Sequence, residues 1–206
     1  MLNEQEKFWF GKFGKKYINR DLKLNNISNR KYFFQTVLNK HNSIKTIIEF
    51  GCNQGLNLRA IHLINKKIRL SGVDINEQAI KNLNKWGIVS SYVGSIAKFK
   101  TNKKFDLTFV YGLLIHINPK NLKTIYQKLY QHSKKFILIA EYYNPYPIKL
   151  NYRGYKNKLF KRDFAGEMLK KYKNLTLIDY GFHYHGDTTK SGDDISWFLL
   201  KKNKKL

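Results

Sequence analysis

The sequence has 206 residues, of which 42% are hydrophobic; this is enough to bury the core of one domain and excludes a disordered chain. No apolar stretch approaches the ~20 residues that a membrane span needs, and the first ten residues lack the features of a signal peptide. Cys52 is the single cysteine, which excludes a disulfide framework and fits a reducing cytoplasm. The formal net charge is +25, from 39 lysine and arginine residues against 14 acidic ones, so an acidic partner has to be considered.

Short apolar runs rich in β-branched residues alternate with segments of helical periodicity, which predicts a mostly parallel sheet flanked by helices. In the first half of the chain we expect helices over residues 4–17 and 29–39 and strands over residues 44–50, 68–75 and 89–93. A helix should follow each of the first two strands, and Asn76 is a suitable N-cap for the second of these helices.

In the second half of the chain the pattern predicts strands over residues 105–111, 136–141, 175–184 and 195–201 and a helix over residues 163–172. The pair Asn118-Pro119 is typical of a helix start and places a further helix between the first two of these strands. Residues 144–161, with two prolines, a glycine and several tyrosines, are expected to form a long loop of the kind that often carries function.

These elements predict an α/β fold with a doubly wound, seven-stranded, mostly parallel sheet. No helix separates the last two strands, so they should form an antiparallel hairpin at one edge of the sheet. We expect one domain over residues 1–206, in which residues 1–42 form a helical cover and residues 43–206 form the α/β core.

The end of the first strand carries the clearest binding signal, since ligands of doubly wound sheets lie at the carboxyl ends of the strands. The run from Glu49 to Gly55 places Gly51 at a tight turn and Gly55 at the start of a helix. A carboxylate at Glu49 repels a pyrophosphate but suits a cationic aminoacyl group. Asp74, which ends the second strand, has the spacing of an acid that accepts hydrogen bonds from ribose hydroxyls.

Taken alone, the glycine turn is an ordinary strand-to-helix turn and Asp74 an acid that starts a helix, but the combination favours nucleoside binding. From Ile44 to Glu141 the sequence resembles the class I S-adenosylmethionine-dependent methyltransferases, whose pattern is acidic-x-Gly-x-Gly-x-Gly. Asn53 stands where the family has its middle glycine, and asparagine tolerates the same backbone angles.

The resemblance implies a Rossmann-like methyltransferase fold, S-adenosylmethionine as cofactor and S-adenosylhomocysteine as product. The cofactor contacts that it implies are Glu49, Gly51, Asn53 and Gly55 around the methionine portion, Asp74 at the ribose, Ile75, Gly94, Ser95 and Ile96 around the adenine, and Tyr111, Gly112 and Leu113 beneath the sulfonium. Many members of the family have an acidic residue where Ser95 stands.

A narrower resemblance covers most of the chain and concerns the methylases associated with pseudaminic acid biosynthesis. It rests on the segments 8–11, 17–20, 114–119, 140–145, 152–154, 158–166 and 193–198. This resemblance implies an acceptor linked to nonulosonic acids or surface polysaccharides.

Three residues after the central strands are candidates for catalysis: His116, Glu141 and Tyr142. His116 is either a base for an acceptor hydroxyl or amine or a buried histidine bound to a backbone carbonyl. Glu141 is either a partly buried carboxylate with a raised pKa or one satisfied by local N–H groups.

Basic and aromatic residues follow and are candidates for binding an anionic acceptor. The expected substrate contacts are Tyr143, Asn144, Tyr152, Arg153, Lys161 and Arg162, with Arg153 and Arg162 the strongest among them. Tyr17 recurs at helical spacing with Trp9 and Phe13, either as core packing or as a lid over the cofactor. The histidines at 183 and 185 lack further ligands, so no metal is expected.

The function predicted from these features is methyl transfer from S-adenosylmethionine to oxygen or nitrogen of a small acidic acceptor, a sugar or nucleotide sugar. The charge of +25 motivates a second hypothesis, an RNA or other nucleic-acid methyltransferase. Only six of the basic residues are arginine, however, which favours lysines spread over solvated faces. A third hypothesis is a cofactor-binding protein without catalysis.

Overall fold

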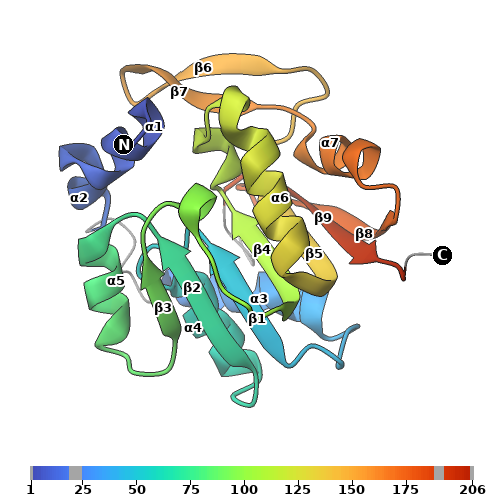
Figure 1. The fold of residues 1–206 in the computed structure, drawn as a ribbon. Helices are drawn as coiled ribbons and strands as arrows, with labels where there is room; N and C mark the ends of the chain where they lie inside the picture. Colours follow the sequence, from blue (N-terminus) through green and yellow to red (C-terminus); the bar gives the residue numbers. More distant parts are fainter. Residues whose placement is uncertain (1, 19–24, 188–192, 205–206) are drawn as a thin grey trace. The chain divides into compact units, whose positions relative to one another are not determined.

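The computed structural model describes residues 2–18, 25–187 and 193–204. The chain divides into two compact units, Met1–Asp106 and Leu107–Leu206. Among the described residues, seven strands follow the order β3-β2-β1-β4-β5-β9-β8, and β6 and β7 pair separately (Figure 1). This confirms the predicted fold class. No helix of the described residues is long and apolar enough to cross a membrane.

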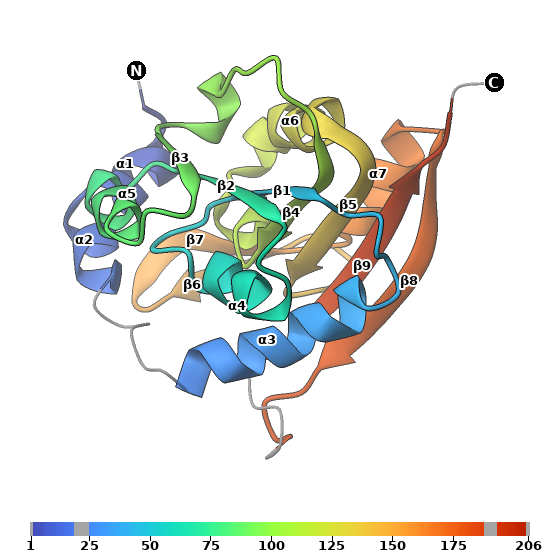
Figure 2. The ribbon, with the colours of Figure 1, turned by 90° about the horizontal axis from the view of Figure 1, so that it is seen from below.

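The first unit contains three parallel strands and their helices. Its elements are α1 (Glu4–Phe10), α2 (Lys12–Ile18), α3 (Asn25–Leu38), β1 (Thr46–Phe50), α4 (Leu56–Ile64), β2 (Arg69–Asp74), α5 (Glu77–Asn84), β3 (Ser90–Val93) and the 3-10 turn η1 (Ile96–Lys98). The last four residues of β1 are all buried, as expected for a parallel strand covered on both faces. Helix α3 packs along α4 (Figure 2), and Asn76 caps α5 as predicted.

The segment predicted as one helix over residues 4–17 forms two short helices. Helix α1 ends at Gly11, whose N–H donates to the carbonyl of Lys7. A Cβ atom built on Gly14 would lie 1.6 Å from the carbonyl oxygen of Trp9, so only glycine allows α2 to approach α1 this closely. Helical periodicity does not reveal such a fold-back, because the aromatic residues keep their spacing across it.

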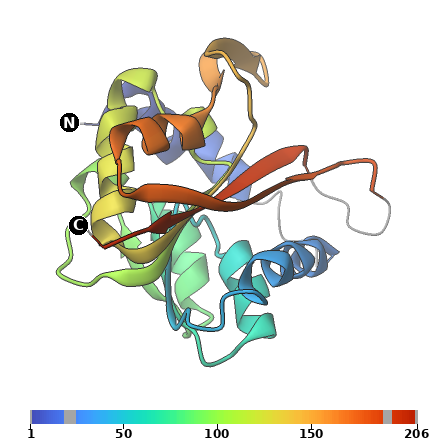
Figure 3. The same ribbon diagram turned by 90° about the vertical axis from the view of Figure 1, so that its right-hand side faces the viewer.

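The second unit contains the rest of the sheet. Its elements are most of β4 (Phe105–Tyr111), η2 (Leu114–His116), η3 (Pro119–Asn121), α6 (Leu122–His132), β5 (Ser133–Glu141), β6 (Ile148–Tyr152), β7 (Tyr155–Lys161), α7 (Phe164–Lys171), β8 (Leu175–His183) and β9 (Ile195–Lys202). Strand β9 runs antiparallel to both β5 and β8, which confirms the predicted terminal hairpin. Figure 3 shows this hairpin with α7 beside β8.

The prediction of a long loop over residues 144–161 is wrong, because most of this segment forms the hairpin β6–β7. Its turn has Arg153 and Gly154 at positive φ, 51° and 84°, which is the combination that two-residue hairpin turns require. Arginine rarely occupies such a position, so the usual Asn-Gly signal was missing. The hairpin packs against η2, which follows β4 in the same unit.

Candidate functional site

The turn after β1 has the backbone that the sequence predicted. Gly51, Asn53 and Gly55 all have positive φ, at 78°, 46° and 75°. The N–H groups of Gly51 and Cys52 both donate to the carbonyl of Val73 in β2, which fixes the turn to the neighbouring strand. Asn53 therefore has the left-handed conformation that asparagine tolerates and that a glycine at this position would adopt without strain.

Glu49 is buried at the end of β1, with 1% of its surface exposed. Its Oε1 atom accepts a hydrogen bond from Asn57, whose own side-chain oxygen accepts one from Arg30 of α3. No described residue donates to the other carboxylate oxygen, Oε2. Burial raises the pKa of Glu49 to about 8. A cationic group within reach of Oε2 would satisfy this carboxylate.

Asp74 joins the end of β2 to both neighbouring turns. It accepts hydrogen bonds of 2.8 Å from the N–H of Asn53 and from the N–H of Asn76. Asp74 thus binds the N–H of Asn76, the N-cap of α5, and its predicted contact with a ribose stays a prediction. Burial raises its pKa while these backbone hydrogen bonds lower it. A carboxylate has about four acceptor sites, so capacity for ribose hydroxyls remains.

The N-terminal helices contact the turns that follow β1 and β3. Ser95, two residues after the end of β3, donates a hydrogen bond to Glu6 of α1. Gln54 in the turn after β1 donates to the carbonyl of Ile18 at the end of α2, at 2.6 Å. Sequence reasoning missed Glu6 and Gln54, because nothing in the local pattern indicates a contact that spans 89 residues.

An aromatic cluster lies on these two helices and includes the predicted cofactor contact Tyr17. The ring centroid of Trp9 lies 5.3 Å from that of Phe13 and 5.2 Å from that of Tyr17, and Phe8 stacks on Phe13. All four side chains are partly exposed. The cluster is therefore neither a fully buried core nor an isolated surface feature, and the contact of Tyr17 with a cofactor stays a prediction.

In the second unit, Glu141 is buried at the end of β5, with 2% of its surface exposed. Oε1 accepts hydrogen bonds from the N–H groups of Leu113 and Leu114, at 2.9 and 2.8 Å, and Oε2 accepts a longer one from Ile115. Burial raises the pKa of Glu141 to about 8. This geometry assigns Glu141 to positioning of the segment after β4; its predicted catalytic role stays a prediction.

His116 is buried in η2 and joined to the hairpin. Its Nδ1 atom lies 2.8 Å from the carbonyl oxygen of Lys158, and its ring lies against that of Tyr152. Since a carbonyl can only accept, Nδ1 carries the proton and Nε2 is the acceptor nitrogen. Burial lowers the pKa of His116 to about 4, so the ring is neutral at pH 7. His116 is thus a buried histidine bound to a backbone carbonyl, and its role as a base stays a prediction.

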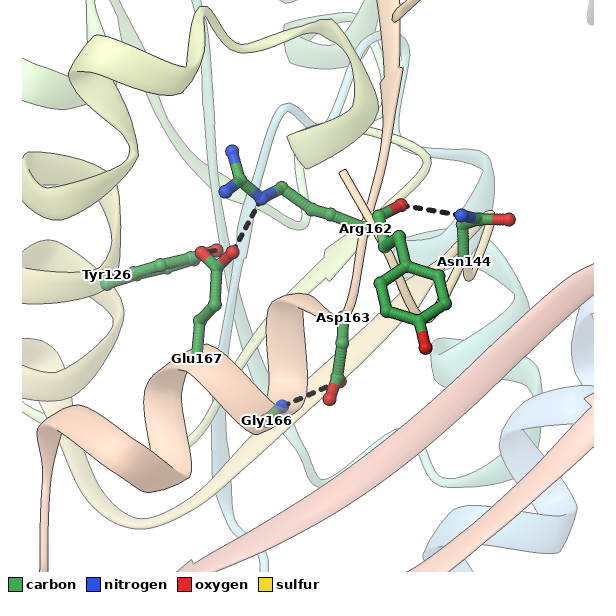
Figure 4. A network of polar contacts seen from close by, with 7 residues as sticks. Tyr126, Asn144, Arg162, Asp163, Gly166 and Glu167 are labelled. Carbon is green, nitrogen blue, oxygen red and sulfur yellow. Dashed lines mark hydrogen bonds and ion pairs between the residues drawn. The ribbon is translucent and has the colours of Figure 1, made fainter. Parts of the chain in front are cut away.

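Arg162 follows the hairpin and is held by an acidic residue of α7 (Figure 4). Its Nε atom donates to Glu167 Oε1 at 2.6 Å, while the hydroxyl of Tyr126 donates to Glu167 Oε2 at 2.7 Å. The Arg162 side chain is 18% exposed. In Figure 4 the dashed line to Glu167 starts from Nε, and no described residue accepts a hydrogen bond from the two Nη atoms.

The other residues predicted to bind the methyl acceptor differ in their exposure and in their contacts. Arg153 is exposed at the hairpin turn and lies over the ring of Tyr152, and Tyr143 is 43% exposed. The ammonium of Lys161 lies 5.1 Å from the ring centroid of Tyr142. Asn144 donates a hydrogen bond to the carbonyl of Tyr146.

The structure also places two further candidate groups, Cys52 and the histidine pair near the end of β8. Cys52 is buried, and a Cβ atom on Gly72 would lie 2.7 Å from its sulfur, so the thiol packs against the backbone of β2. Burial raises the pKa of Cys52 well above its usual value. His185 pairs with Asp194 at 2.8 Å, and no three potential metal ligands cluster in the part of the chain that the structure describes.

Comparisons with known proteins agree with this architecture. Residues 47–135 match the family model described as a methyltransferase domain, and no curated protein sequence matches the chain. The 1,6-didemethyltoxoflavin-N1-methyltransferase of Burkholderia thailandensis superimposes with a TM-score of 0.67 at 13% identity, over 93% of this chain and 83% of that one. The magnesium protoporphyrin IX methyltransferase of Synechocystis PCC 6803 gives 0.67 at 12% identity, over 98% and 99%.

The plantazolicin methyltransferase BpumL gives a TM-score of 0.66 at 16% identity, over 97% of this chain and 94% of that one. All three were solved with S-adenosylmethionine or S-adenosylhomocysteine bound. Residues 47–135 therefore match a methyltransferase domain, and the chain has the fold of these S-adenosylmethionine-dependent methyltransferases. The predicted enzyme class is confirmed.

Proposed function

We propose that the protein transfers a methyl group from S-adenosylmethionine to oxygen or nitrogen of a small acidic acceptor. The acceptor that we infer is a sugar or nucleotide sugar of nonulosonic acid or surface polysaccharide biosynthesis, as the resemblance to pseudaminic acid methylases suggests. The solved structures named above include methyltransferases named for a toxoflavin precursor and for a magnesium porphyrin, which supports an acceptor of small size.

The observation that carries the cofactor assignment is Glu49, whose buried Oε2 atom lacks a donor among the described residues. The ammonium of a methionine portion supplies the donor and charge that this oxygen requires. Beside it, the positive-φ turn leads into α4, whose N-cap Gly55 makes no side-chain cap hydrogen bond to the first N–H groups of the helix. Asp74 has remaining acceptor capacity for a ribose. When bound, S-adenosylmethionine supplies an electrophilic methyl group on sulfur.

The remaining predicted cofactor contacts stay part of this proposal. In the first unit, Ile75 and the segment from Gly94 to Ile96 stand at the ends of β2 and β3. In the second unit, Gly112 has φ of 63°, and its N–H donates to Ala140. Glu141 accepts hydrogen bonds from the N–H groups of Leu113 and Leu114, which ties the end of the segment from Tyr111 to Leu113 to β5.

The acidic nature of the acceptor is supported by Arg162. Glu167 occupies only the Nε edge of its guanidinium, so the two Nη groups present a planar pair of donors, which suits a carboxylate or a phosphate. His116 is the residue that we expect to take a proton from an acceptor hydroxyl or amine, since its Nε2 atom is an acceptor at neutral pH.

Calorimetric titration tests the cofactor first. We expect S-adenosylmethionine and S-adenosylhomocysteine to bind and NAD and ATP not to, and Asp74→Ala to weaken both sulfur ligands by about tenfold or more. No binding, or a preference for NAD or ATP, contradicts the proposal.

Transfer of labelled methyl groups then tests the acceptor, with acidic sugars, neutral sugars and RNA offered in parallel. We expect Arg162→Lys to raise KM for the acidic acceptor by about tenfold, because lysine keeps the charge but loses the paired donors. The exposed Arg69 provides the control, since Arg69→Lys should change nothing. Methylation of RNA in preference to any sugar supports the alternative class.

A further inference from the structure

Acidic groups stand at the ends of all three strands of the first unit, but the third comes from a distant part of the chain. Glu49 ends β1 and Asp74 ends β2. Strand β3 is followed by Gly94 and Ser95, which carry no charge. The hydroxyl of Ser95 donates to Oε1 of Glu6, so a carboxylate of α1 stands at the end of β3.

Glu6 is held in this place from its own helix. The N–H of Asn3 donates to Glu6 Oε2 at 2.8 Å, and the N–H of Glu6 donates to the side chain of Asn3, which is a complete capping box. A carboxylate has about four acceptor sites, and the described residues use two of them here. The Glu6 side chain is partly exposed, so a ligand can reach the remaining sites.

The end of β3 beside Glu6 is open. Gly94 has φ of 145°, and a Cβ atom built on it would meet no atom within 4 Å. Strand β3 is the parallel neighbour of β2, with Val93 opposite Asp74, and the N–H of Gly94 donates to the carbonyl of Asp74. Neighbouring strands lie about 4.8 Å apart. A nucleoside whose ribose is bound by Asp74 therefore extends its base over this end of β3.

A carboxylate at that position selects a nucleobase by the hydrogen-bond donors that the nucleobase carries. An ionised carboxylate accepts hydrogen bonds and donates none. Among the atoms of the adenine ring system, the 6-amino group is the donor. A base with a carbonyl or a hydrogen in place of the amino group leaves Glu6 without this partner.

We propose that Glu6 binds the 6-amino group of the cofactor's adenine, so that α1 sets base selectivity as well as covering the strand ends. This inference rests on the proposed function, because it requires an adenine nucleoside at Asp74. Glu6 belongs to the N-terminal helical cover. Its carboxylate provides the contact to the 6-amino group that the uncharged residues after β3 do not provide.

The test compares two ligands by calorimetry: S-adenosylhomocysteine and its analogue with hydrogen in place of the 6-amino group. The wild-type protein should prefer S-adenosylhomocysteine by about tenfold, the value of one hydrogen bond to a charged group. Glu6→Gln should reduce this preference roughly fivefold. Glutamine also completes a capping box and can accept from Ser95, so α1 should remain in place. The matched control is Glu4→Gln, which removes the same charge from an exposed position of the same turn.

Two results overturn the inference while leaving the cofactor assignment intact. In the first, the wild-type protein binds both ligands equally. In the second, Glu6→Gln weakens both ligands by the same factor, which shows that Glu6 only holds α1. Failure of the wild-type protein to bind either ligand is a different result and contradicts the proposed function itself.

Discussion

Two buried glutamates end strands of this protein, and they differ in what surrounds their oxygens. Glu141 at the end of β5 accepts three hydrogen bonds from backbone N–H groups of its own unit. Glu49 at the end of β1 accepts one from Asn57 and has an oxygen to which no described residue donates a hydrogen bond. Burial raises the pKa of both to about 8.

The difference shows that burial and a raised pKa do not by themselves identify a binding residue. Glu141 has its partners in the chain, so its carboxylate stabilises a conformation. Glu49 lacks one, so its carboxylate is suited to a ligand that brings a positive charge. The comparison therefore predicts that one glutamate matters most for folding and the other most for binding.

The largest expected effect is on stability. Glu141→Ala removes the acceptor of three backbone N–H groups and should lower the free energy of unfolding by about 3 kcal/mol. Glu49→Ala loses one hydrogen bond and also removes an unsatisfied oxygen, so it should cost about 1 kcal/mol. Urea unfolding at pH 7 measures both variants. Equal losses of unfolding free energy in the two variants would contradict the prediction that Glu141 matters more for folding than Glu49.

The second prediction concerns the pH dependence of cofactor binding. Because the pKa of Glu49 is about 8, the carboxyl of the ligand-free protein holds its proton at pH 6. A cationic aminoacyl group favours the carboxylate and lowers this pKa, so binding releases the proton. The affinity for S-adenosylhomocysteine should therefore increase from pH 6 to 7.5, by up to about tenfold per pH unit, and level off above 8.

Calorimetry in buffers of different protonation enthalpy measures this proton release directly. Glu49→Gln has no proton to release and should give a nearly flat profile over the same range. A wild-type affinity that is constant from pH 6 to 7.5 would show that Glu49 does not face the charged group.

The sequence predicts the strands and the first turn well, because strand periodicity and positive-φ positions are local properties. Asn53 illustrates this, since its tolerance of the left-handed conformation is a property of the residue itself. The prediction of a loop over residues 144–161 was wrong for a local reason, because an arginine occupies a turn position that usually holds asparagine or glycine.

The candidate site is less predictable, because its polar partners are distant in sequence. Glu141 and the N–H groups that satisfy it are 26 to 28 residues apart, and Glu6 and Ser95 are 89 residues apart. A carboxylate that ends an apolar run has the same appearance in the sequence whether or not the chain supplies its donors. Both interpretations of Glu141 could therefore be stated beforehand; the fold shows the N–H donors, and the catalytic role stays a prediction.

A smaller effect is expected for the polar chain behind Glu49. Asn57 donates to Glu49 and accepts from Arg30, so Arg30→Gln should weaken the orientation of Asn57 without exposing the carboxylate. The positive charge of Arg30 also lowers the pKa of Glu49. Arg30→Gln should therefore move the pH profile of S-adenosylhomocysteine binding upward by a few tenths of a pH unit. A downward displacement of the profile would contradict this electrostatic role.

The smallest expected effect tests the turn that follows Glu49. Asn53 has φ of 46°, a conformation that glycine adopts without steric cost. Asn53→Gly restores the family's glycine, but glycine also loses more conformational entropy on folding, so these terms oppose each other. We expect stability to change by less than about 1 kcal/mol and S-adenosylhomocysteine affinity by less than about threefold. Asn53→Val is the contrasting variant, since a β-branched residue at this φ is strained and should weaken binding. If Asn53→Gly instead weakened binding tenfold while Glu49→Gln did not, the Asn53 side chain rather than the Glu49 carboxylate would be the group that holds the ligand.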